Sequence, residues 1–315
     1  MNNYFKKKVV VLAGGPSCER EISLVSGKAV ADALAEKGFE VQTLDPIGNF
    51  LESLKANNGC SIFLALHGTF GEDGTIQRIL EKEGLPYTGS GPEASERAFD
   101  KSQAQALFKK EGLRIPEFRI FQKHDALHFP KSFPIPAVVK PTCSGSSVGV
   151  SILLKEADFV KAAREAFRYS DSILVERYVH GRELTVGILG GEALPIVEVI
   201  AERKFYDYEA KYKDSRTHYE VPADLTANQA EEVSKMALIA YKILGCEVMA
   251  RVDIILADDG KPVVLEVNTL PGLTGKSLLP KAAKARGFDF GDLCVRILEL
   301  SEEIRRVPRG QTIQN

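Results

Sequence analysis

The sequence contains no tryptophan and only five cysteines among its 315 residues. The number of cysteines is odd and their spacing matches no metal-binding pattern, which excludes a disulfide scaffold and a cysteine-ligated zinc site. The motifs HExxH and CxxC are absent as well, which argues against zinc-protease and redox functions. We expect free thiols in a reducing compartment at Cys18, Cys60, Cys143, Cys246 and Cys294.

Long apolar runs are also missing. A membrane span needs about 18 or more consecutive apolar residues, and the run at residues 9–13 is too short for a secretory signal. The net charge of −2 gives no electrostatic reason to expect nucleic acid or a membrane surface as a partner. We therefore expect a cytoplasmic protein with neither kind of partner.

What is present is an ordinary soluble composition, 44% hydrophobic and 27% charged, and enough chain for two or three domains. Strand and helix patterns alternate over residues 8–96, which predicts a small parallel sheet. A helical stretch at about 92–112 leads into a second unit, and residues 226–244 open with a capping-box pattern. The other predicted strands are 118–122, 137–140, 148–153, 173–177, 184–189 and 194–199, and a C-terminal helix is predicted at 289–304.

The segment at residues 247–276 reads as a β-hairpin with its turn centred between positions 259 and 260. That register places Asp253 opposite Glu266 and Arg251 opposite Asn268, all on one face. Like charges placed opposite each other destabilise a ladder, whereas a divalent cation would bring these oxygen ligands together. A magnesium site is the preferred interpretation, and a solvated hairpin face is the alternative.

Two further segments carry candidate binding groups. Lys140 ends a predicted strand and is followed by a Gly/Ser-rich loop at 142–149, whose backbone amides suit a phosphate. It is not a P-loop, since the motif GxxxxGK[ST] is absent and no helix obviously follows it. The alternative is a flexible hairpin turn. Glu176 and Glu183 flank a strand junction, where carboxylates bind a nucleotide or lie at the surface.

Strand ends in the first unit predict a second place for ligands. His67 follows the third strand, and Ser17 and Glu19 follow the first. Ligands of open α/β sheets bind outside the carboxyl ends of the strands, so His67 and Glu19 are expected at one mouth. The alternative for His67 is a purely structural role. The loop after the first strand lacks GxGxxG, so a dinucleotide fingerprint is not supported.

Six segments, taken in order, resemble the D-alanine–D-alanine ligases of the ATP-grasp superfamily, and they span nearly the whole chain. They are AGGPSCEREISLVSG (13–27), LHGTFGEDGTIQ (66–77), VVKPTCSGSSVGVS (138–151), VERYVHGREL (175–184), YDYEAKY (206–212) and ARVDIILADDGKPVVLEVNTLPGLTGKSLLP (250–280). The resemblance implies an α/β, ATP-grasp fold. Its parts would be an N-terminal Rossmann-like substrate domain (1–96), two α+β ATP-clamping domains (97–180 and 181–306) and a flexible tail (307–315).

The same resemblance implies where ATP and metal bind. Two Mg²⁺ ions are expected, for which Mn²⁺ can substitute, with Asp253, Glu266 and Asn268 as ligands. The ATP-binding residues would be Lys101, Lys140 and Ser147 near the phosphates, Glu176, Tyr178 and Val179 at the adenine, Glu183 at the ribose, and Lys211.

For the substrates, the resemblance implies that Glu19 holds the ammonium of the first D-alanine, with Ser146 and Tyr212 as its hydrogen-bonded partners. Arg251 and the Gly272 backbone would form the oxyanion site. The second D-alanine would bind through Ser277 and Leu278, and His67 would help to position substrate. The expected reaction joins two D-alanine molecules through a D-alanyl phosphate, for peptidoglycan precursor synthesis, and a homodimer is expected.

Three positions depart from the common pattern. Lys276 stands where many relatives have histidine, Gln105 replaces a frequent lysine, and Tyr178 replaces a common tryptophan. The competing interpretations are a D-alanine–D-lactate ligase, which Tyr212 disfavours, and a nucleotide-binding module that has lost catalysis. Intact Lys140, Arg251 and the metal ligands argue against the second.

Overall fold

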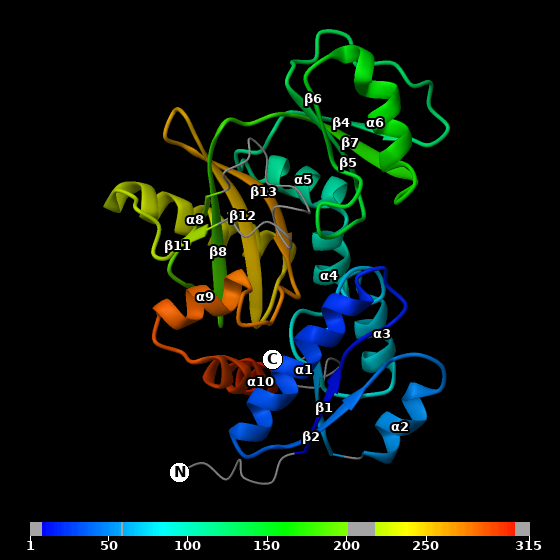
Figure 1. The fold of residues 1–315 in the computed structure, drawn as a ribbon, viewed down its shortest axis with the longest axis vertical. Coiled ribbons are helices and arrows are strands. Elements are labelled where there is room, and N and C mark those ends of the chain that lie inside the picture. Colours follow the sequence, from blue (N-terminus) through cyan, green and yellow to red (C-terminus); the bar gives the residue numbers. More distant parts are fainter. Residues whose placement is uncertain (1–7, 58, 201–217, 306–315) are drawn as a thin grey trace, which may run out of the picture.

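A computed structural model describes residues 8–57, 59–200 and 218–305. It contains three sheets, and the chain passes through them in order from the N-terminus, with helices beside each (Figure 1). In Figure 1 the first sheet lies at the bottom, the second at the top and the largest between them. Among the described residues no helix is both long and apolar enough to span a bilayer.

The N-terminal unit is a three-stranded parallel sheet in the order β2-β1-β3, which confirms the predicted topology. Its central strand is buried along most of its length, as a parallel strand covered on both faces must be. The first helix ends at Glu36, and Gly38, just beyond the C-cap Lys37, adopts a left-handed φ of 90° that stops the helix there. The elements are β1 (Lys8–Leu12), α1 (Arg20–Glu36), β2 (Glu40–Leu44), α2 (Phe50–Ala56), β3 (Ser61–Leu64), α3 (Thr75–Lys82) and α4 (Pro92–Phe99).

The second unit is an antiparallel sheet in the order β4-β7-β5-β6, with its own small core. The helical stretch predicted at about 92–112 is confirmed, and it consists of two helices, α4 and α5. It breaks at Asp100, whose extended ψ of 98° ends α4 and whose side chain accepts from the amides of Ser102 and Gln103 to cap the next helix. The elements are α5 (Lys101–Lys110), β4 (Phe118–Gln122), β5 (Ala137–Pro141), β6 (Ser151–Leu153), η1 (Glu156–Asp158), α6 (Phe159–Ala166) and β7 (Ser172–Arg177).

The third unit is an antiparallel sheet in the order β11-β10-β8-β12-β13, with β9 beside β8. Its longest helix, α8, begins with the predicted capping box of Thr226 and Gln229. The elements are β8 (Gly181–Leu189), β9 (Glu192–Ala193), β10 (Val197–Ile200), β11 (His218–Glu220), α8 (Ala227–Leu244), β12 (Met249–Ala257), β13 (Pro262–Asn268), α9 (Leu278–Ala285) and α10 (Phe290–Arg305).

The β12–β13 hairpin has the predicted pairing at the site and a different turn. Asp253 pairs with Glu266 and Arg251 with Asn268, as expected. Closer to the turn the register changes, so that Ile254 lies opposite Val264. The turn is therefore one residue longer than the predicted two-residue turn, and a β-bulge at this point restores the expected register beyond it.

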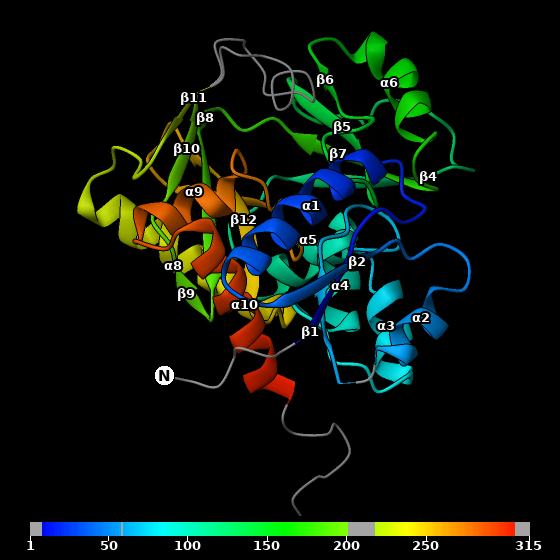
Figure 2. The same ribbon diagram turned by 60° about the horizontal axis from the view of Figure 1, so that its bottom comes forward.

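The first and third units share one core. Buried side chains of β1, β3, α9 and α10 belong to a single hydrophobic cluster, and Figure 2 shows α1 running beside α10. Lys37, at the end of α1, adds ion pairs of 2.9 Å to Asp289 and 2.5 Å to Asp292. The first unit is thus held against the third.

Gly27 tests the contact between α1 and β1. A Cβ at this buried helical position would overlap the Cβ of Ala13, at the end of β1. We expect Gly27→Val to lower the free energy of unfolding by about 1–3 kcal/mol, because the added atoms overpack the core. Urea denaturation measures it, and Lys28→Ala, at the exposed neighbouring position, is the control. Equal stability of the two variants would contradict the described packing.

Candidate active site

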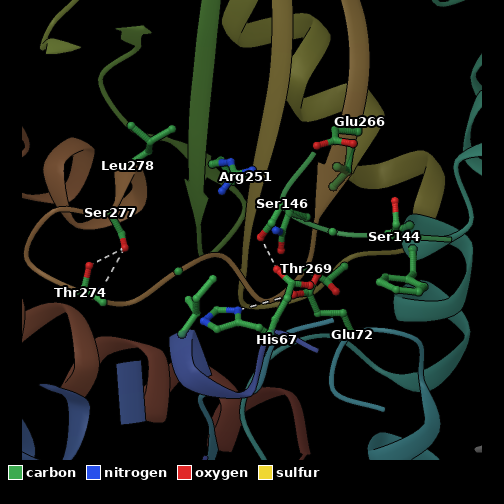
Figure 3. A pocket seen from close by; sticks show the side chains of 18 of the residues that line it. His67, Glu72, Ser144, Ser146, Arg251, Glu266, Thr269, Thr274, Ser277 and Leu278 are labelled. Atoms are coloured by element: carbon green, nitrogen blue, oxygen red, sulfur yellow. Dashed lines mark hydrogen bonds and ion pairs between the residues drawn. The ribbon is translucent and has the colours of Figure 1, made fainter. Parts of the chain in front are cut away.

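The described residues enclose a cavity of about 820 Å³ at the junction of the three units. Glu19, His67 and Glu72 of the first unit line it, as do Lys101 and residues 144–146 of the second. The third unit contributes polar residues of β12 and β13 and the segment that leads into α9 (Figure 3). His67 and Glu19 therefore lie at one mouth, as the strand ends predicted.

Glu19 connects the first unit with the Gly/Ser-rich loop. Ser146 Oγ donates a hydrogen bond to Glu19 Oε1. Gly68 and Gly145 approach the Glu19 carboxylate so closely that a Cβ on either would overlap it. The buried carboxylate thus lies between two backbone segments whose close approach requires glycine at positions 68 and 145, and it lines the cavity.

His67 is held by two neighbours that sequence reasoning did not select. Its Nε2 lies 3.0 Å from Ser26 Oγ, and its Nδ1 lies 3.5 Å from Glu72 Oε1. Glu72 in turn accepts a hydrogen bond of 2.9 Å from the amide of Gly68. Glu72 belongs to the HGTFGEDG segment, so its spacing from His67 was a visible signal, whereas Ser26 is brought in only by the packing of α1.

The β12–β13 face carries Arg251 and the predicted metal ligands. Arg251 donates to Asp253 through Nε at 2.9 Å and Nη2 at 2.8 Å, and Thr185 Oγ1 also donates to Asp253. Glu266 Oε2 lies 3.4 Å from Lys101 Nζ. Two carboxylates and two cations therefore meet at this edge of the cavity, and their charges compensate one another.

The donor set at this face suits Mg²⁺. Asp253, Glu266 and Asn268 offer only oxygen ligands from paired strands. Asn268 Oδ1 accepts a 3.0 Å hydrogen bond from Leu270 N and keeps a second lone pair. Glu266 and Asn268 line the cavity. Within the described ranges no cluster of three or more His, Cys, Asp or Glu side chains could bind a metal, so the predicted set depends on the asparagine.

The segment before α9 forms the opposite wall. Ser277 precedes the first residue of the helix, and its Oγ lies 2.8 Å from Thr274 Oγ1 and accepts from Thr274 N at 3.2 Å. A Cβ on Gly272 would lie 2.9 Å from Ser277 Oγ. Leu278 is buried beside it, and Lys276 also lines the cavity. The exposed amides of a helix N-terminus suit a carboxylate at this wall.

A second group of predicted residues lies apart from this cavity, between the second and third units. Lys140 Nζ pairs with Glu176 Oε2 at 2.7 Å, and both side chains are buried. The Tyr178 ring packs edge-on against His180 at 4.7 Å. Burial, with a smaller effect of the Glu183 carboxylate, raises the pKa of Tyr178 above its usual value.

Of four further predicted site residues, the structure describes Ser147 and Val179 only. Ser147 has the left-handed φ of 58° in the loop that contacts Glu19, and Val179 is half-buried after β7. Lys211 and Tyr212 lie outside the described residues.

Comparison with known families agrees with this architecture. A model of the D-alanine–D-alanine ligase C-terminus matches residues 107–299, and one of the N-terminus matches residues 48–90. A solved D-alanine–D-alanine ligase of Bacillus anthracis, complexed with ATP, superposes with a TM-score of 0.84 at 34% identity. The match covers 95% of this chain and 98% of that one. The protein therefore has the ATP-grasp fold.

Curated relatives carry the same name. A D-alanine–D-alanine ligase of Methylacidiphilum infernorum is 46% identical over 301 residues, covering 96% of this chain and 97% of the relative. One from Anaeromyxobacter dehalogenans is 44% identical over 302 residues, covering 95% and 98%. The chain belongs to the D-alanine–D-alanine ligase family.

The Lys140–Glu176 pair gives a stability test. Lys140→Met leaves a buried carboxylate without its cation, so we expect a loss of about 3–5 kcal/mol in the free energy of unfolding. Adding Glu176→Gln should recover much of that loss, because the uncompensated charge is gone. The exposed pair of Lys123 and Asp171 is the control, and Lys123→Met should change little. A double variant no more stable than Lys140→Met would contradict the buried pair.

Proposed function

We propose that this protein joins two D-alanine molecules to D-alanyl-D-alanine at the expense of ATP, through a D-alanyl phosphate, for peptidoglycan precursor synthesis. The choice of D-alanine as the substrate rests on the family to which the chain belongs. The single observation on this chain that supports it best is one cavity lined by Glu19, Arg251 and Ser277. A carboxylate for an ammonium, a cation for an oxyanion and a helix N-terminus for a carboxylate are what two amino acids and a tetrahedral intermediate need.

In this proposal the first D-alanine binds with its ammonium at Glu19, which Ser146 orients and with which Tyr212 is expected to cooperate. His67, fixed by Ser26 and Glu72, positions the substrate from the other side. One carboxylate oxygen attacks the γ-phosphorus of ATP, the bond to the bridging oxygen of the β-phosphate breaks, and ADP leaves. The product is an acyl phosphate.

The second D-alanine is proposed to place its carboxylate at Ser277 and Leu278. Its ammonium group first loses a proton, and the neutral amine then attacks the acyl carbon and gives up a second proton as the amide forms. Arg251 with the Gly272 amide stabilises the oxyanion. The tetrahedral intermediate then collapses. The bond between its central carbon and the oxygen that carries the phosphoryl group breaks, and inorganic phosphate leaves. Loop 142–149 is proposed as a lid that keeps water from the acyl phosphate.

ATP is the co-substrate. We propose that Lys101, Lys140 and Ser147 contact its phosphates, with Lys211 from the segment outside the described residues. Glu176, Tyr178 and Val179 would contact the adenine, and Glu183 the ribose. Asp253, Glu266 and Asn268 would hold Mg²⁺, or Mn²⁺ in its place, which supplies charge neutralisation at the phosphates when bound. Two ions, a homodimer and a cytoplasmic location are proposed on the family resemblance alone.

Phosphate release from Mg-ATP tests the function. We expect release with D-alanine alone, accompanied by the dipeptide, because both subsites are built for an amino acid. D-Alanine with D-lactate is the comparison, at neutral and higher pH. Release that requires D-lactate would replace the proposal with a D-alanine–D-lactate ligase, and no release under either condition would contradict both.

Glu266→Gln tests the metal assignment. The change removes one charge while keeping the size of the side chain, so we expect kcat/KM for Mg-ATP to fall at least about 100-fold. The unfolding midpoint should stay near that of the wild type. Glu231→Gln, on the exposed surface of α8, is the matched control. Near wild-type turnover in the Glu266 variant would contradict the metal site.

A further inference from the structure

Gln105 is a fully buried polar residue to which nothing above assigns a role. It lies on α5 one turn after Lys101, on the same side of the helix. Its side-chain Nε2 donates a hydrogen bond to Glu176 Oε1. Its Oε1 is buried and has no partner within the described part of the chain. A fully buried amide that leaves one of its atoms unpaired needs a physical reason.

The orientation of this amide follows from its partner. An ionised carboxylate only accepts hydrogen bonds, so the NH₂ group of Gln105 must face Glu176 and the carbonyl must point away. The unpaired Oε1 is thus a direct consequence of holding Glu176. An apolar residue of the same size would avoid the cost of burying an unpaired oxygen. It would also remove the hydrogen bond to Glu176 Oε1.

Neighbouring groups hold both the backbone and the carboxylate of Glu176. It lies on β7 between β4 and β5, where its backbone pairs with Phe118 on one side and Val138 on the other. Lys140 holds its Oε2 at 2.7 Å. Gln105 holds Oε1, so the two oxygens have different partners and the plane of the carboxylate is fixed. Each oxygen keeps a lone pair that neither Lys140 nor Gln105 uses.

We propose that Gln105 is a positioning residue that makes the nucleotide site select a 6-amino purine. The inference rests on the proposed contact between Glu176 and the base. A fixed carboxylate keeps its acceptor lone pairs in one direction, where they accept a hydrogen bond from the 6-amino group of adenine. A 6-oxo purine places an acceptor there and leaves two acceptors facing each other, which a rigid site rejects far more strongly than a mobile one.

A neutral amide suits this task because it leaves the charge of the carboxylate largely in place. Lys140 already supplies one cation to Glu176. Gln105 contributes a hydrogen bond without a second full positive charge, so the carboxylate keeps its strength as an acceptor for the base. The rigidity comes from α5, which Asp100 caps and whose first amide donates to Thr142 O at 3.0 Å.

The test compares kcat/KM for ATP with that for inosine triphosphate, which carries a 6-oxo group and is otherwise closely similar. In Gln105→Met the preference for ATP should fall about tenfold, because a hydrogen bond to a charged group is lost, while the KM for D-alanine stays unchanged. Gln105→Lys keeps a donor to Glu176 but adds a second positive charge that weakens the carboxylate as an acceptor, so its preference for ATP should lie between those of the wild type and Gln105→Met. Gln103→Met makes the same change on the exposed side of α5 and is the control.

The outcomes separate this inference from the function on which it depends. A wild-type protein inactive with ATP and D-alanine would contradict the proposed function itself. An active wild type whose preference is unchanged in Gln105→Met, or whose activity falls equally with both nucleotides, would overturn the role of Gln105. A Gln105→Lys variant as unselective as Gln105→Met would overturn it too. If Gln105→Met does not fold, Gln105→Asn, whose shorter amide cannot reach Glu176, takes its place.

Discussion

The pairing of two carboxylates across the β12–β13 hairpin is the constraint on which the site depends. Asp253 and Glu266 lie directly opposite each other, and such a pair is unfavourable unless cations accompany it. Arg251 supplies one cation from the same strand, and Lys101 supplies the other from α5. The chain breaks between α4 and α5 at Asp100, and Lys101, the first residue of α5, lies beside Glu266. The second unit thus supplies a cation to the paired carboxylates of the third.

A similar arrangement recurs in the second unit, one turn further along α5. There Glu176 is held by Lys140 from β5 and by Gln105 from α5. One helix thus brings Lys101 to one carboxylate and Gln105 to another, and Lys101 also donates to Ser144 O at 2.6 Å in the loop that covers the cavity. A shift of α5 would therefore disturb the surroundings of both carboxylates together.

Sequence patterns predicted the parts of this design that depend on local spacing. The parallel order of the first sheet, the cap of α8 and the facing pair of Asp253 and Glu266 are confirmed. The hairpin register was right although the turn was wrong, since a bulge compensates for the longer turn. Glu72 lies in the same segment as His67 and was a visible signal that was missed. The contacts of Ser26 with His67 and of Gln105 with Glu176 could not be predicted, because they arise where segments distant in sequence pack together.

The central claim is that a D-alanine carboxylate is activated by direct attack on the terminal phosphorus of ATP. D-Alanine carrying ¹⁸O in both carboxylate positions tests it most directly, with the released phosphate analysed by mass spectrometry. The acyl phosphate route transfers one carboxylate oxygen to phosphorus, so each inorganic phosphate should contain one ¹⁸O atom. Unlabelled phosphate formed together with the dipeptide would contradict the account.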